Sequence, residues 1–211
     1  PVVDAFSEVR RQHDIADEEV HAFVDAMITD IDTDRYETYD DLAGYMRGSA
    51  AAVGHMMRTV MDPDDPETAR SHAGALGEAF QLTNFIRDVR EDIRDLDRVY
   101  LPDRWLAQHD VPEEDLRAAR ITNGYPTLLE EAMETAEQHY RESFDGVAAL
   151  PFRSRYCIRA AARMYREILN EVRANNYDNL NRRAYVPLRR KLSLVVLDRY
   201  QRRKHRLTSE I

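Results

Sequence analysis

Apolar residues recur at intervals of three and four along almost the whole chain, and this spacing constrains the fold more than any other feature. No segment shows the alternation of apolar and polar residues that a half-buried strand would have. The spacing predicts helices over about residues 2–13, 17–31, 38–61, 66–94, 103–108, 127–148, 152–175 and 187–205, with another beginning near Pro112. Because 211 residues suffice for one substantial core, we expect a single all-α domain over residues 1–211.

Three oxygen-bearing side chains, Asn84, Asp88 and Asp92, follow one another at intervals of four in the predicted helix over 66–94. Residues four apart lie nearly above one another on a helix, so the three side chains would form one stripe. Carboxylate and amide oxygens are hard ligands that suit Mg²⁺. The alternative is a solvated acidic face, paired with the arginines that surround it. The spacing alone favours this second reading.

Composition limits the class of protein and its partners. The net charge of −9 argues against nucleic acid as the main partner. The chain has no apolar stretch near the ~20 residues of a membrane span and no signal-peptide pattern, and its single Cys157 cannot form an internal disulfide. These features indicate a cytoplasmic protein. Only two of the 30 basic residues are lysine, which suits the acidic surface of a halophile, although a GC-rich genome would also explain the arginines.

Three motifs occur in the same order as in a known family. The string QLTNFIRDVREDIRDLDRVYLP at 81–102 resembles the second aspartate-rich motif of the phytoene synthase and squalene synthase family of head-to-head prenyl diphosphate synthases. The run from Arg35 to Gly54 resembles the Tyr- and Gly-rich helix of that family, and 165–169 with 183–186 resembles its C-terminal signature. The Tyr-Leu-Pro ending is more like phytoene synthases. The resemblance implies an isoprenoid-synthase-type helical bundle around a central cavity.

The resemblance also implies roles for individual residues. Asn84, Asp88 and Asp92 would bind the metal, with Tyr45, Asp88 and Asp92 as the catalytic residues. The diphosphate would be bound by Gln81, Arg87, Tyr165 and Arg183. The Arg-x-Tyr-Val pattern favours Arg183, and Arg182 is the alternative if the loop after Tyr165 is one residue longer than usual in the family.

The helix predicted over 38–61 is rich in small residues, and Gly in a helix interior costs about 0.5–1 kcal/mol relative to Ala. Gly44, Gly48, Ala51 and His55 would share one face. A face of this kind admits either a ligand chain or a closely packed neighbouring helix, and the sequence does not decide between them.

The implied activity is a Mg²⁺-dependent condensation of two geranylgeranyl diphosphates to phytoene in carotenoid biosynthesis, with Mn²⁺ as an alternative metal and no need for NADPH. Two alternatives are the formation of squalene or dehydrosqualene from farnesyl diphosphate, and a non-catalytic relative that acts as a scaffold. The basic, partly apolar segment from Arg182 to Arg206 would either close the bundle or contact the inner face of a membrane peripherally.

One part of the family pattern is not found. The first aspartate-rich motif, Asp-x-x-x-Asp, does not occur in the expected place before Tyr45, and the chain begins with Pro. We therefore expect the C-terminal two-thirds of a longer synthase, without its first helices. With one metal-binding wall instead of two, these residues alone should be inactive.

Overall fold

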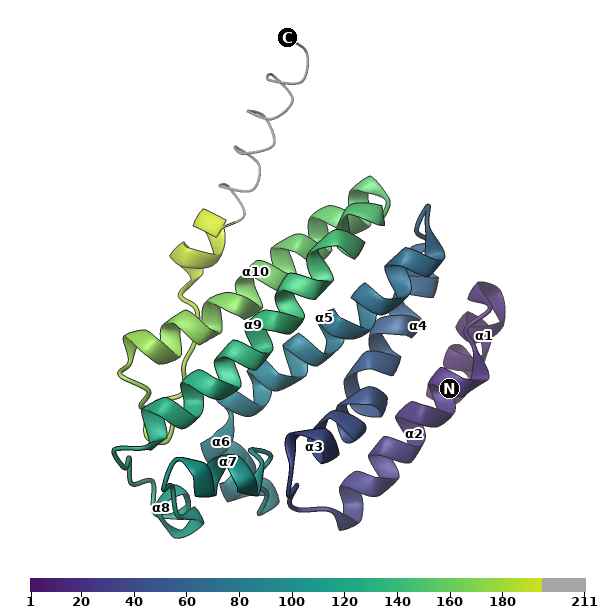
Figure 1. The fold of residues 1–211 in the computed structure, drawn as a ribbon. Helices are drawn as coiled ribbons and strands as arrows, with labels where there is room; N and C mark the ends of the chain where they lie inside the picture. The colour runs from purple at the N-terminus through teal and green to yellow at the C-terminus, as the bar shows by residue number, and fades with distance from the viewer. Residues whose placement is uncertain (195–211) are drawn as a thin grey trace.

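Helices form nearly all the regular structure in the computed structural model, which describes residues 1–194 (Figure 1). They are α1 (Val2–His13), α2 (Asp17–Asp32), α3 (Tyr39–Met46), α4 (Ala52–Met61), α5 (Pro66–Arg87), α6 (Val89–Glu91), α7 (Asp103–Gln108), α8 (Glu113–Arg117), α9 (Tyr125–Ala149) and α10 (Phe152–Ala174), with two π-helical segments, η1 (Arg47–Ala51) and η2 (Asp92–Leu96). Within 1–194 the only β contact is an isolated bridge between Arg35 and Val99. The all-α prediction is confirmed. No helix in this part of the chain is long and apolar enough to cross a membrane.

Helix α5 is central to the arrangement. It packs along α9 on one side and against η1 and α4 on the other, while α10 contacts both α5 and α9 (Figure 1). Helix α2 covers η1 and α4 from outside. The long helices therefore form successive layers, and α5 contributes to both of the interfaces that enclose the interior.

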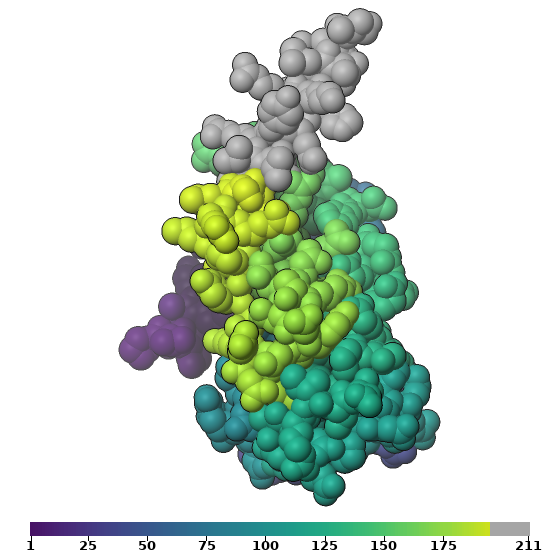
Figure 2. Space-filling view, turned by 90° about the vertical axis from the view of Figure 1, so that its left-hand side faces the viewer, coloured from purple at the N-terminus to yellow at the C-terminus, as the bar shows by residue number. Residues whose placement is uncertain are grey.

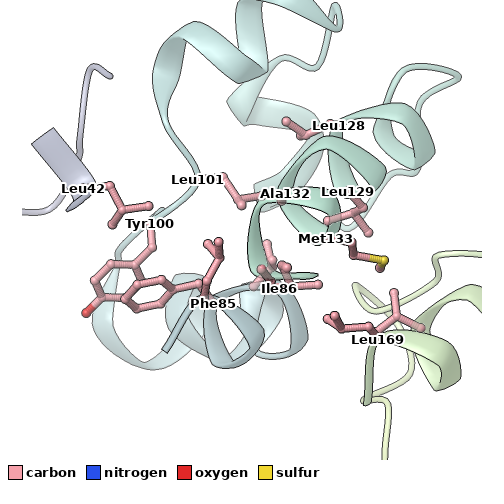
Figure 3. Packing of buried hydrophobic residues seen from close by; sticks show 14 of the residues in the cluster. Leu42, Phe85, Ile86, Tyr100, Leu101, Leu128, Leu129, Ala132, Met133 and Leu169 are labelled. Atoms are coloured by element: carbon pink, nitrogen blue, oxygen red, sulfur yellow. The ribbon is translucent and has the colours of Figure 1, made fainter. Parts of the chain in front are cut away.

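The core lies where α5, α9 and α10 meet (Figure 3). Ile86 of α5, Met133 of α9 and Leu169 of α10 are fully buried there. Each such side chain stabilises the fold by about 1.5–3 kcal/mol relative to an exposed position. This packing holds the last turn of α5 in place, and with it the start of the segment that follows Ile86.

The predicted start of the helix over 38–61 is correct. Thr38 and Asp41 form a capping box in which each side chain binds the backbone N–H of the other residue. The helix runs to Met61, but its middle turn, Arg47–Ala51, is π-helical. Such single-turn insertions occur frequently at functional sites.

The predicted helix over 66–94 is interrupted, and in this respect the prediction was wrong. Asp65 caps α5 and Pro66 occupies its first position, as the sequence indicates. At Asp88, however, the backbone adopts φ −102° and ψ 14°, which lies in the bridge region and ends α5. The short α6 and the π-helical η2 follow.

The small residues of η1 and α4 mainly allow helices to approach closely. A Cβ at Gly48 would collide with the Ala22 carbonyl of α2, and a Cβ at Gly54 would collide with the Ala73 carbonyl of α5. The structure thus favours helix packing at Gly48 and Gly54. At Gly44, in contrast, a Cβ would meet nothing within 4 Å.

Helix α1 has the predicted boundaries but none of its residues is buried. Its apolar residues are exposed, with Val2 at 82% and Phe6 at 40%. Figure 2 shows this helix, in purple, projecting from the side of the molecule. At the other end, residues 188–194 are helical. Positions 195–205 of the helix predicted over 187–205, and positions 195–206 of the basic segment from Arg182 to Arg206, lie outside the described residues.

Candidate active site

The predicted polar stripe survives the interruption of α5. The N–H of Asp88 donates to the Asn84 carbonyl at 2.8 Å, and the N–H of Asp92 donates to the Asp88 carbonyl at 2.8 Å. These bonds span four residues, as in an α-helix, so the helical rise between the three residues is kept. Asn84, Asp88 and Asp92 therefore remain stacked from α5 into η2.

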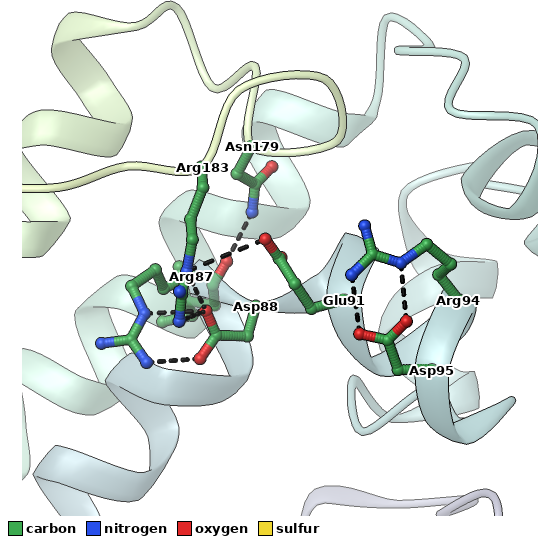
Figure 4. A network of polar contacts seen from close by, with 8 residues as sticks. Arg87, Asp88, Glu91, Arg94, Asp95, Asn179 and Arg183 are labelled. Atoms are coloured by element: carbon green, nitrogen blue, oxygen red, sulfur yellow. Dashed lines mark hydrogen bonds and ion pairs between the residues drawn. The ribbon is translucent and has the colours of Figure 1, made fainter.

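Asp88 is the centre of a cluster of charged side chains (Figure 4). Arg87 Nε donates to its Oδ1 atom at 2.8 Å, and Arg87 Nη2 pairs with Oδ2. Arg183 donates to the same Oδ1 through Nε at 3.0 Å, and its Nη2 lies 2.8 Å away. Glu91 lies 3.8 Å from Arg183 Nε. The structure thus brings together two arginines that the sequence places 96 positions apart, and Arg183 is the arginine of the late motif that reaches Asp88.

Burial and the crowding of acids at the stripe raise the pKa of Asp92. Burial, followed by the nearby charges of Asp88 and Glu91, raises the pKa of Asp92 to about 7, while Arg87 and Arg183 act in the opposite direction. The hydrogen bond to Asp88 raises the pKa of Arg87, and Tyr165 contributes to the same effect. An acid held in this way is set to accept a cation, because positive charge would relieve the repulsion among the carboxylates.

A cavity of about 340 Å³ runs beside this cluster. Its walls are mostly apolar and come from η1, α4, α5, α9 and α10, and they include Val53, Met57, Leu76, Phe80, Val147 and Ile158. The residues that α5 contributes extend from Ala69 to Asn84, a length of about 22 Å at 1.5 Å per residue. Gln81, Asn84 and Tyr165 also line it. Since Asn84 is one turn from Asp88, the charged cluster adjoins one end of a long apolar cavity.

Tyr45 lies in a cluster of aromatic rings. Its ring is 5.5 Å from that of Tyr36, 6.1 Å from that of Tyr100 and 6.4 Å from that of Phe85, all between ring centroids. Burial, together with nearby Tyr100 and Asp30, raises the pKa of the Tyr45 hydroxyl. Among the described residues that line the cavity, Tyr45 is not included. The placement of Tyr45 beside the diphosphate stays a prediction.

Two residues of the cluster were missed in the sequence. Glu91 is one turn from Arg87, and it was overlooked because it lies off the four-residue stripe. Asn179 lies in a segment predicted only as a joint between helices, yet its side chain is fully buried. Figure 4 shows it on the same loop as Arg183. An Asn in a loop carries no sequence signal that would separate this role from an ordinary turn.

The chemistry of the stripe fits a hard cation. The Asn84 Oδ1 atom is buried without a hydrogen-bond partner, which is uncommon for such a group. Within residues 1–194 no three acidic, imidazole or thiol groups are placed to enclose an ion by themselves. Mg²⁺ needs no such enclosure, because it binds through one or two carboxylates and completes its shell with water and phosphate oxygens. Asn84, Asp88 and Asp92 are thus suited to share a cation with a bound diphosphate.

Comparison with known proteins gives consistent matches. The squalene/phytoene synthase family model matches residues 1–190. Phytoene synthase 1 of Arabidopsis thaliana is 38% identical over 179 residues, which cover 82% of this chain and 42% of that protein. The phytoene synthase of Thermus thermophilus is 41% identical over 162 residues, covering 77% and 55%. A crystal structure of a dehydrosqualene synthase in complex with ligand has a TM-score of 0.80 at 30% identity, covering 90% of this chain and 66% of that one. The chain spans about half the length of the curated relatives it matches.

Proposed function

Because this chain belongs to the squalene/phytoene synthase family, we propose that the protein to which it belongs joins two molecules of geranylgeranyl diphosphate head-to-head to form phytoene. The two substrates lose two diphosphates and two protons in total, through a cyclopropyl intermediate. No electrons are added, so the reaction needs no NADPH.

One observation carries this proposal: the long apolar cavity adjoins the cluster of Arg87, Asp88 and Arg183. An allylic diphosphate has the same two parts, a hydrocarbon chain and a multiply charged head. A cavity with water-excluding walls protects the cation that forms when the head leaves. The charged end supplies donors to the departing oxygens.

In this proposal each residue of the site has a separate role in binding the diphosphate, the metal or the hydrocarbon chain. Arg87 and Arg183 donate hydrogen bonds to the diphosphate, and Tyr165, which lines the cavity near Arg87, adds its hydroxyl. Gln81 lies one turn before Asn84 and extends the polar end of the cavity. Mg²⁺, held by Asn84, Asp88 and Asp92, would supply positive charge that stabilises the leaving diphosphate. The apolar walls keep the remaining allylic carbon away from water.

A second candidate is the formation of dehydrosqualene or squalene from farnesyl diphosphate. The structural match to a dehydrosqualene synthase favours it, because the two chains share their fold at a TM-score of 0.80 and 30% identity. The two candidates differ in the chain length of the substrate, which depends on the far end of the cavity, and squalene additionally requires NADPH.

Incubation of the full-length protein with Mg²⁺ and either the C15 or the C20 diphosphate, followed by identification of the products, tests the proposal. Phytoene from the C20 substrate without a reductant is the expected product. A C30 product alone would replace it with the second candidate. Release of no diphosphate from either substrate, by a protein that folds, would leave only the role of a non-catalytic scaffold.

A further inference from the structure

Asn179 joins three parts of the structure through one buried side chain. It is 1% exposed. Its Oδ1 atom accepts a hydrogen bond at 2.7 Å from the hydroxyl of Tyr125, the first residue of α9, and its Nδ2 atom donates to the Ile86 carbonyl. Ile86 is in the last turn of α5, where carbonyls lose their intrahelical partners. The amide therefore ties the segment after α10 to the end of α5.

The position of this tie is what distinguishes it from an ordinary buried amide. On one side it holds Ile86, which directly precedes Arg87 and Asp88. On the other side it is four residues before Arg183, whose guanidinium closes onto Asp88. Leu180 and Ala184, which are both 1% exposed, keep the intervening backbone against the core. Asp88 and Arg183 are therefore both connected, through short stretches of backbone, to the hydrogen bonds of Asn179.

We propose that Asn179 is a positioning residue, which sets the distance between the Arg183 guanidinium and the Asp88 carboxylate and so prepares both for one diphosphate. The role in diphosphate binding rests on the proposed function, whereas the tie itself does not. Asn179 touches no reacting atom in this scheme. It acts through Ile86 on one side and through the backbone of 180–183 on the other.

The tie is tested by amide hydrogen exchange in Asn179→Asp, which keeps the shape of the side chain but removes the donor to Ile86. Exchange should accelerate about tenfold in both 86–92 and 178–186, while the middle of α10 is unchanged. Tyr125→Phe removes only the hydroxyl and is the milder variant, should Asn179→Asp fail to fold; it should accelerate the same two segments to a smaller extent. Acceleration in only one of the two segments, or in neither, would overturn the proposal.

Positioning is tested by calorimetric titration with inorganic diphosphate in the presence of Mg²⁺. Asn179→Asp should bind the probe about tenfold more weakly. The control is Tyr140→Phe, which removes a buried hydroxyl that lies 3.0 Å from Thr83 Oγ1 within the core. It should lose stability without losing affinity. Equal affinity in Asn179→Asp and the wild-type protein would overturn the positioning role. If the wild-type protein binds no diphosphate, the proposed function fails, and the exchange result still decides whether the tie exists.

Discussion

Arg183 donates to the Oδ1 atom of Asp88 at 3.0 Å, although the two are 95 positions apart in the sequence. That oxygen also accepts from Arg87, so one carboxylate is shared by two guanidinium groups. Without a ligand, these cations neutralise Asp88. A diphosphate would offer them more negative charge than the carboxylate does, and their transfer would leave Asp88 free to face a metal.

Arg183→Ala should weaken the binding of inorganic diphosphate in the presence of Mg²⁺ by at least tenfold, because a charge-assisted donor is lost. The measurement is a calorimetric titration. Arg182→Ala is the matched control, since it removes the same charge from the neighbouring exposed position, and its affinity should stay within about twofold. Equal losses in both variants would mean that only the net charge of the segment matters.

Asp88→Ala should abolish prenyl transfer in the full-length enzyme while leaving the helical content nearly unchanged. The side chain contacts Arg87 and Arg183, not the apolar core, so its loss removes little packing. Circular dichroism and product analysis on the same preparation provide the check. A folded variant with full turnover would contradict the assignment of Asp88 to the metal.

In the metal-free protein, the raised pKa of Asp92, about 7, predicts a specific pH dependence. The ordinary value for Asp is about 3.9, so between about pH 4 and 7 the folded state binds more protons than the unfolded state. The contribution of Asp92 to stability is therefore complete below about pH 4 and declines as the pH rises through 7.

Asp92→Asn removes this titration, so its stability relative to the wild-type protein should increase from pH 4 to pH 7. Urea unfolding midpoints measured with a chelator present test this difference. A difference that does not change with pH would show that folding does not raise the pKa of Asp92.

Ala73→Phe should shift the substrate preference from the C20 toward the C15 diphosphate. Ala73 lines the cavity, about 16 Å along α5 from Asn84, so a ring there would shorten the space for a hydrocarbon chain. Competition between the two substrates gives the ratio of products. Ala148→Phe, which places the same ring on the exposed face of α9, should leave that ratio unchanged. A shift in both variants would mean that the effect does not come from the cavity.

Two glycine substitutions should change stability in opposite directions. A Cβ at Gly77 would collide with the Ala50 carbonyl, so Gly77→Ala should destabilise the protein by about 1–3 kcal/mol. Gly44→Ala meets no neighbour within 4 Å and should stabilise the protein by about 0.5–1 kcal/mol, through helix propensity alone. Chemical denaturation of both variants measures the two free energies of unfolding. Destabilisation by Gly44→Ala would contradict the open space at that position.

Much of the fold could be predicted because each helix carries its own local signals. The capping box at Thr38 and the Asp65-Pro66 start of α5 depend on a few neighbouring residues, and both are found in the structure. The break at Asp88 could not be predicted in this way. It coincides with contacts to Arg183, which a local pattern does not contain.

The candidate site also has some features that local spacing predicts and others that depend on residues distant in the sequence. The stripe of Asn84, Asp88 and Asp92 depends on helical spacing, and it persists because the four-residue hydrogen bonds continue across the break. The position of the Tyr45 side chain depends instead on residues that are not its neighbours in the sequence. The structure places its ring among those of Tyr36, Tyr100 and Phe85. Asn179 was missed because its two partners, Tyr125 and Ile86, are distant in the sequence.

The close contact between α4 and α5 has a consequence for how substrate preference can evolve. At Gly54, α4 meets α5 backbone against backbone, and at Gly77, α5 meets η1 in the same way, so no smaller side chain exists that would widen the cavity there. Side chains farther along, such as Met57, Met61 and Leu150, can still be exchanged. The backbone contacts therefore fix the width of the cavity at this point. Its depth can change through single substitutions that leave the charged end intact.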